Sequence, residues 1–183
     1  MASVGGGWSG GLILIDTEIM RNIKLNVAAG ADSRAGKAIC SPAAGCDHRA
    51  VEIDYRWRAE ASDDELVSLT LSHGGTAEPG WWDRVRAHSL GWVTARLPGG
   101  ALIGFVNVAW DGSDHAFLLD TKVRPDHQHR GIGTELVRRA AQAAQGAGCT
   151  WLHVDFEPHL RSFYFDACGF RPTDAGLVLL ADR

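Results

Sequence analysis

The stretch VRPDHQHRGIGTELV, residues 123 to 137, decides the fold of this chain. Within it, Gln128 to Gly133 fits the pattern Q/R-x-x-G-x-G. Two glycines one residue apart let the backbone turn sharply and leave no Cβ in the way of a ligand, so successive N–H groups can point at one spot. A helix that begins there adds the positive end of its dipole. The pattern therefore predicts a cradle for a phosphate or pyrophosphate.

The residues on either side of this loop predict a strand before it and a helix after it. Residues 115–123, HAFLLDTKV, are mostly apolar, as expected of a buried strand. Downstream, apolar residues recur at three- and four-residue spacing, which predicts a helix from about residue 133 to 145; they are Leu136, Val137, Ala140, Ala141 and Ala144. Gly146 and Gly148 then end it. The glycines thus lie between a strand and a helix, where an anion cradle belongs.

Two other glycine-rich phosphate loops fit these residues poorly. A P-loop needs Lys followed by Ser or Thr, but Thr134 follows Gly133 directly. A dinucleotide-binding loop needs a third glycine at position 136, where this chain has Leu136.

Composition limits the class of protein. With 183 residues, 45% of them hydrophobic and 22% charged, the chain is expected to form one globular domain. Its net charge of −4 argues against a nucleic-acid partner. The longest apolar run near the N-terminus is Leu12 to Ile15, which predicts neither a membrane span nor a signal peptide. The cysteines form no C-x-x-C pair, so we expect a reduced, cytoplasmic protein without a metal site.

The chain divides near residue 50. Residues 1–49 are rich in Gly, Ala and Ser, a composition that buries little surface, and are interpreted as a flexible or accessory extension. We expect this extension to be dispensable for catalysis. Residues 50–183 are expected to form the folded domain.

Within that domain the hydrophobic pattern predicts alternating strands and helices. Ser62 and Glu65 form a capping box that opens a helix, and Pro98-Gly99-Gly100 is a turn between two strands. Strands are expected at residues 51–57, 91–97, 101–110, 115–123, 151–156 and 176–180, and helices at 62–71, 81–88, 133–145 and 160–167. This order predicts an α/β (α+β) fold, a mixed sheet with helices on both faces.

The chain resembles the GNAT N-acetyltransferase superfamily over roughly residues 50–180. The stretch 123–137 is similar to that family's acetyl-CoA motif, and FYFDACGF, residues 163–170, is similar to its second signature, an aromatic helix ending in Gly-Phe. The resemblance implies a mostly antiparallel central sheet and acetyl-CoA as cosubstrate. It also implies that Thr121 and Val123 line the pantetheine arm, and that the backbone amides of seven residues hold the pyrophosphate: Gln128, His129, Arg130, Gly131, Ile132, Gly133 and Thr134.

Two residues are candidates for proton transfer, which the transfer of an acetyl group to an amine requires. The family places a Tyr as general acid four residues before the Gly of Gly-Phe, where this chain has Phe165. Tyr164 lies one residue earlier and is our candidate acid; a core aromatic role is the alternative, with Cys168 as a fallback donor. Asp120 is our candidate base because an acidic residue inside an apolar strand is costly unless it is paired or functional. Some aminoglycoside acetyltransferases of this superfamily have an Asp at the matching place, and a simple pair with Lys122 is the alternative here.

The acceptor is less constrained by the sequence. Of the seven tryptophans, Trp81 and Trp82 fall in the helical region that faces the acceptor in this superfamily, and with Asp155 they are candidate substrate residues for a cationic or aromatic amine. A small-molecule amine is the preferred acceptor. A protein N-terminal or lysine acetyltransferase and a non-enzymatic CoA-binding regulatory domain remain open, as does a homodimer.

Overall fold

The computed structural model describes residues 52–180, so the expectation for residues 1–49 lies outside the described part. The chain forms the strands β1 (Asp54–Trp57), β2 (Ser89–Arg96), β3 (Leu102–Trp110), β4 (His115–Val123) and β5 (Trp151–Val154). The α-helices are α2 (Asp63–Ser72), α3 (Trp81–Arg86) and α4 (Ile132–Gly146). Three shorter helical turns are η1 (Pro125–His127), η2 (Pro158–Leu160) and η3 (Phe163–Ala167).

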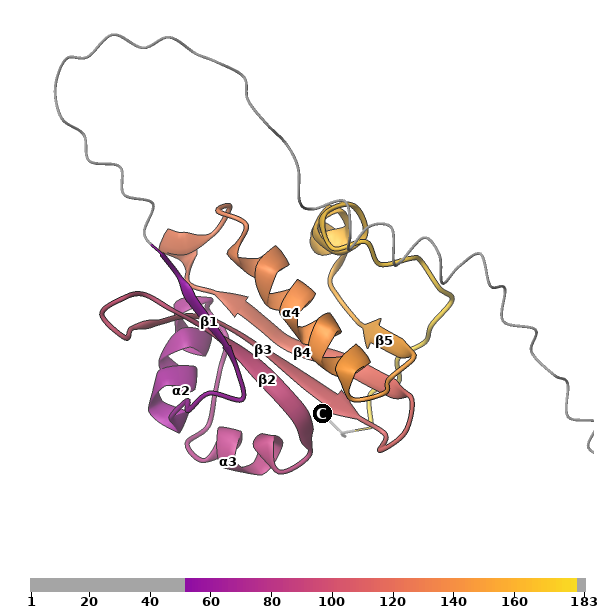
Figure 1. Ribbon diagram of the computed structural model, residues 1–183, viewed down its shortest axis with the longest axis horizontal. Helices are drawn as coiled ribbons and strands as arrows, with labels where there is room; N and C mark the ends of the chain where they lie inside the picture. Colours follow the sequence, from indigo (N-terminus) through magenta and orange to yellow (C-terminus); the bar gives the residue numbers. More distant parts are fainter. Residues whose placement is uncertain (1–51, 181–183) are drawn as a thin grey trace, which may run out of the picture. The chain divides into compact units, whose positions relative to one another are not determined.

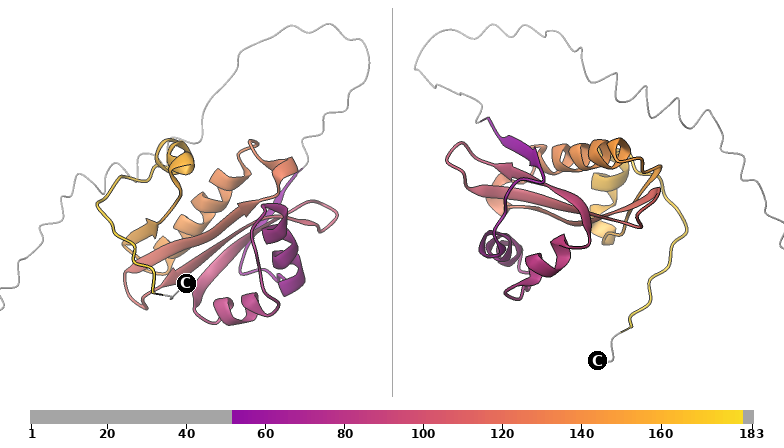
Figure 2. Two further views of the ribbon diagram at one scale, coloured as in Figure 1. Left: turned by 180° about the vertical axis from the view of Figure 1, so that it is seen from behind. Right: turned by 60° about the horizontal axis from the view of Figure 1, so that its bottom comes forward.

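The five strands form one sheet in the order β1-β2-β3-β4-β5 (Figure 1). Three of the four pairings are antiparallel, and β4 with β5 is parallel. Helix α4 covers one face, and α2 and α3 cover the other, as the right-hand view of Figure 2 shows. The expected mixed, mostly antiparallel sheet with helices on both faces is confirmed.

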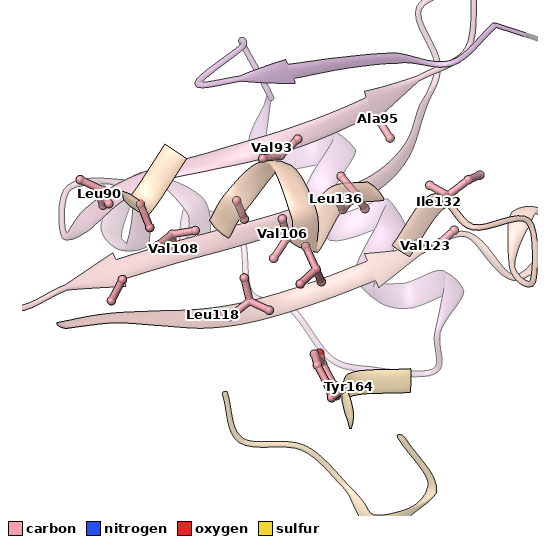
Figure 3. Packing of buried hydrophobic residues seen from close by; sticks show 14 of the residues in the cluster. Leu90, Val93, Ala95, Val106, Val108, Leu118, Val123, Ile132, Leu136 and Tyr164 are labelled. Carbon is pink, nitrogen blue, oxygen red and sulfur yellow. The ribbon is translucent and has the colours of Figure 1, made fainter. Parts of the chain in front are cut away.

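The main core lies between the sheet and α4. Alternate residues of β2, β3 and β4 point at this helix, whose own apolar stripe includes Ile132, Leu136 and Ala140, each at most 1% exposed. Figure 3 shows Val93, Val106 and Leu118 packed around Leu136. Because α4 is held along its length by this core, its N-terminus is fixed beside the end of β4.

A second core lies under α2 and α3. Trp82 is 1% exposed and packs edge-on against Trp92 and Phe105, with ring centroids 4.8 and 5.1 Å away. The predicted capping box opens α2: Ser62 Oγ accepts from the Glu65 N–H, and Glu65 accepts from the Ser62 N–H. The same Glu65 carboxylate accepts two bonds from Arg96 on β2, at 2.5 and 2.9 Å, which ties the helix to the sheet.

This ion pair predicts a pH-dependent stability. Hydrogen bonds from Arg96 lower the Glu65 pKa from 4.5 to about 2. A carboxyl group with a lowered pKa in the folded state stabilises it above its unfolded pKa and loses that contribution as the pH falls. The melting temperature of Glu65→Gln should therefore differ most from that of the wild type at pH 7, and this difference should shrink as the pH falls from about 4.5 to about 2.

The matched control is Glu78→Gln, because the Glu78 side chain is 89% exposed and lies 3.9 Å from Arg84. This variant should melt like the wild type at every pH. A Glu65→Gln difference that is independent of pH would contradict the role of the ion pair.

Two expected elements differ from the structure. Residues 176–180 form no strand, and Leu177 to Leu180 are 65–93% exposed, because no strand among residues 52–180 pairs with them. The expected helix at residues 160–167 is present but is not a regular α-helix: it begins in η2 and ends in the π-helical turn η3, closed by the Cys168 N–H donating to the Phe163 carbonyl. A π-turn takes more residues than an α-turn, so it changes which side chains face the sheet.

Candidate functional site

The loop between β4 and α4 presents a row of free backbone donors. Among residues 52–180, no protein acceptor receives the N–H groups of residues 129 to 134, and Glu135 is the first to bond back, to the Gly131 carbonyl. The N-cap residue Gly131 provides no side-chain cap. Six successive free amides at a helix N-terminus are suited to binding an anion with several oxygens.

The predicted cradle residues do not all contribute in the same way. The Gln128 side chain donates to the Val123 carbonyl at 3.1 Å, which closes the loop onto the end of β4. Its own N–H donates to Pro125, so it is less free than the six amides that follow. Arg130 is exposed and, with His127, lines an open depression of about 440 Å³ on the side of β1.

The two glycines of the motif serve different purposes. Gly131 has φ +77°, a conformation that side chains other than Gly rarely adopt, and a Cβ added there would meet nothing within 4 Å. A Cβ on Gly133 would lie 3.1 Å from the Phe163 ring. Gly131 therefore leaves open space at the cradle, whereas Gly133 allows η3 to pack closely on α4.

Strand β4 has a free edge that leads to this loop. Its last pair with β5 is Leu118 with Val154, so residues 119 to 123 have no strand partner on that side among residues 52–180. At the same place β4 contains a bulge, because Leu119 and Lys122 are three positions apart but pair with residues of β3 that are only two positions apart. Within the bulge, Asp120 has a left-handed backbone conformation with φ +55°. The free edge and the bulge place unpaired backbone groups of Thr121 and its neighbours in line with the cradle.

Tyr164 lies close to this bulge. It is 5% exposed, stacks on Phe156 at 4.7 Å, and points from η3 toward β4 (Figure 3). Burial raises the pKa of its hydroxyl, and the neighbouring Thr121 hydroxyl partly offsets that effect. Thr121 Oγ1 makes no regular hydrogen bond within residues 52–180. The structure thus gives Tyr164 a core position and brings its hydroxyl next to the free edge of β4.

Phe165 and Cys168 occupy different places around Tyr164. Phe165 packs against Phe156 with the Arg161 guanidinium 4.8 Å from its ring. Burial raises the pKa of the Cys168 thiol to about 11, partly offset by a hydrogen bond with Thr134 at the start of α4. The thiol therefore stays protonated at neutral pH, between the cradle and Tyr164.

Asp120 is paired within the protein. Its Oδ1 lies 3.2 Å from Lys122 Nζ, and both side chains are mostly buried, at 29% and 18% exposed. The pairing considered from the sequence is therefore present, and it lies directly at the bulge.

The candidate substrate residues are not brought together. Trp82 belongs to the core under α2 and α3, so its side chain is not available to a substrate, which corrects that assignment. Trp81 is half-buried, and the Lys122 ammonium lies 4.9 Å from its ring centroid. Asp155 is exposed just beyond the end of β5, which stops at Val154 and not at the expected Phe156.

Sequence reasoning missed two residues near the bulge. Asn107 on β3 is 1% exposed, and neither of its side-chain polar atoms has a partner among the described residues. Thr70 on α2 accepts a hydrogen bond from Lys122 at 2.9 Å. An Asn inside the apolar run LIGFVNVAW was a usable signal, since buried amides rarely lack partners without a reason.

No helix in the described part is both long and apolar enough to cross a membrane.

Comparison with known proteins connects this geometry to a family. A family model described as the acetyltransferase (GNAT) family matches residues 53–170. A mycothiol acetyltransferase from Mycolicibacterium vanbaalenii is 34% identical over 110 residues, which are 58% of this chain and 34% of that protein. The match thus spans about a third of the relative's length.

Solved structures share the fold at low sequence identity. A GNAT acetyltransferase from Streptococcus pneumoniae has a TM-score of 0.61 and 20% identity, covering 72% of this chain and 100% of its own. An aminoglycoside N-acetyltransferase in complex with CoA has a TM-score of 0.59 and 19% identity, covering 74% and 98%. Glucosamine-6-phosphate N-acetyltransferase from Arabidopsis thaliana has a TM-score of 0.58 and 15% identity, covering 72% and 99%.

Proposed function

This chain belongs to the GNAT acetyltransferase family, and from that premise we propose that it transfers an acetyl group from acetyl-CoA to a primary amine of a small molecule. The observation that carries the proposal is the row of free amides from residue 129 to 134 at the start of α4. A pyrophosphate is the part of CoA that needs several aligned donors and a positive helix end.

The pantetheine arm of CoA would lie along the free edge of β4. This arm contains amide groups, which can bond to unpaired strand backbone as another strand would. The free edge from Leu119 to Val123 ends where the cradle begins, because the Gln128 side chain holds the loop to the Val123 carbonyl. With the pyrophosphate of acetyl-CoA on the cradle, the thioester end of the same molecule would lie near the bulge at Asp120.

The proposed reaction requires few protein groups. The nitrogen lone pair of the amine forms a bond to the thioester carbonyl carbon, the carbon–sulfur bond breaks, the amine loses a proton, and the CoA thiolate gains one. Asp120 is the proposed acceptor of the amine proton. Tyr164 is the proposed donor to the thiolate, and its raised pKa keeps it protonated at neutral pH. The enzyme also holds both reactants in line, which supplies a large share of the rate.

A turnover assay tests this function. Acetyl-CoA is incubated with the protein and a panel of aminoglycosides, polyamines, aryl amines, alkyl amines and peptides, and release of free thiol is measured with the acetylated amine identified by mass spectrometry. The expected result is amine-dependent thiol release with a small-molecule acceptor. Turnover restricted to peptides would favour a protein acetyltransferase. Binding of acetyl-CoA without turnover of any amine would favour a CoA-binding regulatory domain.

A further inference from the structure

The Lys122 ammonium is held in a fixed place by three elements. It lies 3.2 Å from Asp120 Oδ1 on β4, donates to Thr70 Oγ1 on α2 at 2.9 Å, and lies over the ring of Trp81 on α3. Its side chain is only 18% exposed. An ammonium with a carboxylate, a hydroxyl and an aromatic face around it has little freedom to move away.

This arrangement uses the groups that would otherwise attract a cation. A site for a cationic amine combines a carboxylate with an aromatic face. Here Asp120 and Trp81 offer both, and Lys122 already contacts each of them. A second ammonium brought beside Lys122 would be repelled by it, and the pair leaves no net charge to attract one.

Two apolar side chains are exposed beside this cluster, and the ring of one of them, Phe117, stacks on His153 at 4.9 Å. Phe117 and Leu119 lie on the same face of β4 as Lys122 and are 42% and 43% exposed. Asn107 is opposite Leu119 on β3, with its buried amide unpartnered among the described residues. His73 follows α2, and its pKa is lowered by burial and by Lys122, with a hydrogen bond to the Val123 backbone acting in the opposite direction. At neutral pH its imidazole is therefore neutral.

We propose that Lys122 is a specificity-determining residue, which makes the site select amines that are neutral at physiological pH, such as aryl amines, over strongly basic alkyl amines. The inference rests on the proposed function and names its substrate class. Only the neutral form of an amine has the lone pair that attacks the thioester. A fixed ammonium near the amine disfavours the protonated form, and the apolar surface of Phe117 and Leu119 suits a flat ring.

Two isomeric amines test this selection. 4-Methylaniline and benzylamine have the same atoms and nearly the same size, but only benzylamine is mainly cationic at pH 7.5. We expect the wild type to have the higher kcat/KM for 4-methylaniline. In Lys122→Met, which keeps the length of the side chain without its charge, Asp120 is left unpaired. The ratio of kcat/KM for benzylamine to that for 4-methylaniline should then rise by at least about tenfold.

The matched control is Lys122→Arg, which retains the positive charge and should keep a ratio close to that of the wild type. Calorimetric titration with CoA checks each variant. The proposed contacts of residues 119–123 with the pantetheine arm are made by the backbone, whereas the Lys122 side chain lies against Thr70 and Trp81, so CoA affinity should be unchanged. Lys122→Gln, which is shorter and polar, takes the place of Lys122→Met if that variant does not fold, and the same rise is expected.

Four results would overturn the inference. The first three are a wild type that prefers benzylamine, an unchanged ratio in Lys122→Met with normal CoA affinity, and an equal rise in Lys122→Arg. A wild type that binds acetyl-CoA and acetylates other small amines, but neither isomer, would also overturn it while leaving the proposed function intact. The proposed function itself fails only if the whole panel of small amines is silent.

Discussion

Replacing Gly131 by Glu is expected to weaken binding of acetyl-CoA by at least about a hundredfold. Gly131 lies at the N-cap of α4, where an added Cβ meets nothing within 4 Å and the neighbouring amides have no acceptor among the described residues. A carboxylate there occupies the place of the pyrophosphate and repels it. Calorimetric titration with CoA measures the loss directly.

Two controls separate this effect from damage to the fold. Gly131→Asn tolerates the left-handed conformation at φ +77° without adding charge, so it should keep most of the affinity. Gly146→Glu places the same acidic side chain at the far end of α4, where a Cβ also meets nothing within 4 Å, and should bind CoA normally. Unchanged affinity in Gly131→Glu would show that the pyrophosphate does not bind at this loop.

Removing the hydroxyl of Tyr164 is expected to lower kcat by on the order of 10² to 10⁴. Burial raises the pKa of Tyr164, so its hydroxyl is a proton donor across the neutral pH range. Tyr164→Phe leaves the ring stacked on Phe156 and removes only that donor. Steady-state kinetics should therefore show a large fall in kcat with little change in CoA affinity or melting temperature.

The double variant Tyr164→Phe, Phe165→Tyr tests the register of this helix. Counting along the family's pattern puts the acid at position 165, but Phe165 packs edge-on against Phe156, whereas Tyr164 stacks on that ring, and the Arg161 guanidinium lies over Phe165. A hydroxyl at position 165 is therefore expected not to rescue the activity. Rescue in the double variant, or full activity in Tyr164→Phe, would assign Tyr164 a packing role alone.

The elements with strong periodic patterns could be predicted from the sequence. Strand β4 has the predicted bounds His115–Val123, and α4 begins at Ile132 and ends at Gly146, within a residue of the expected ends. In both, alternating or helical spacing of apolar residues coincides with clear end signals. The placement of the glycine motif between them followed from the same patterns.

The features that depend on contacts between distant residues could not be predicted in this way. The bulge at Asp120 has a non-glycine residue at φ +55°, and its position depends on the register between β3 and β4. The π-turn of η3 depends on how Phe163 packs on Gly133. Adjacent residues on a helix point about 100° apart, and only the packing under α3 decides that Trp82 is buried and Trp81 is not.

CoA is proposed to lie with its pyrophosphate on the amides of residues 129–134 and its pantetheine arm along residues 119–123. Titration of the ¹⁵N-labelled protein with CoA, followed by amide chemical shifts, tests this placement most directly. The largest shifts are expected at the amides of these two segments and should saturate together. Saturable shifts confined to other parts of the chain, or no shifts at millimolar CoA, would contradict it.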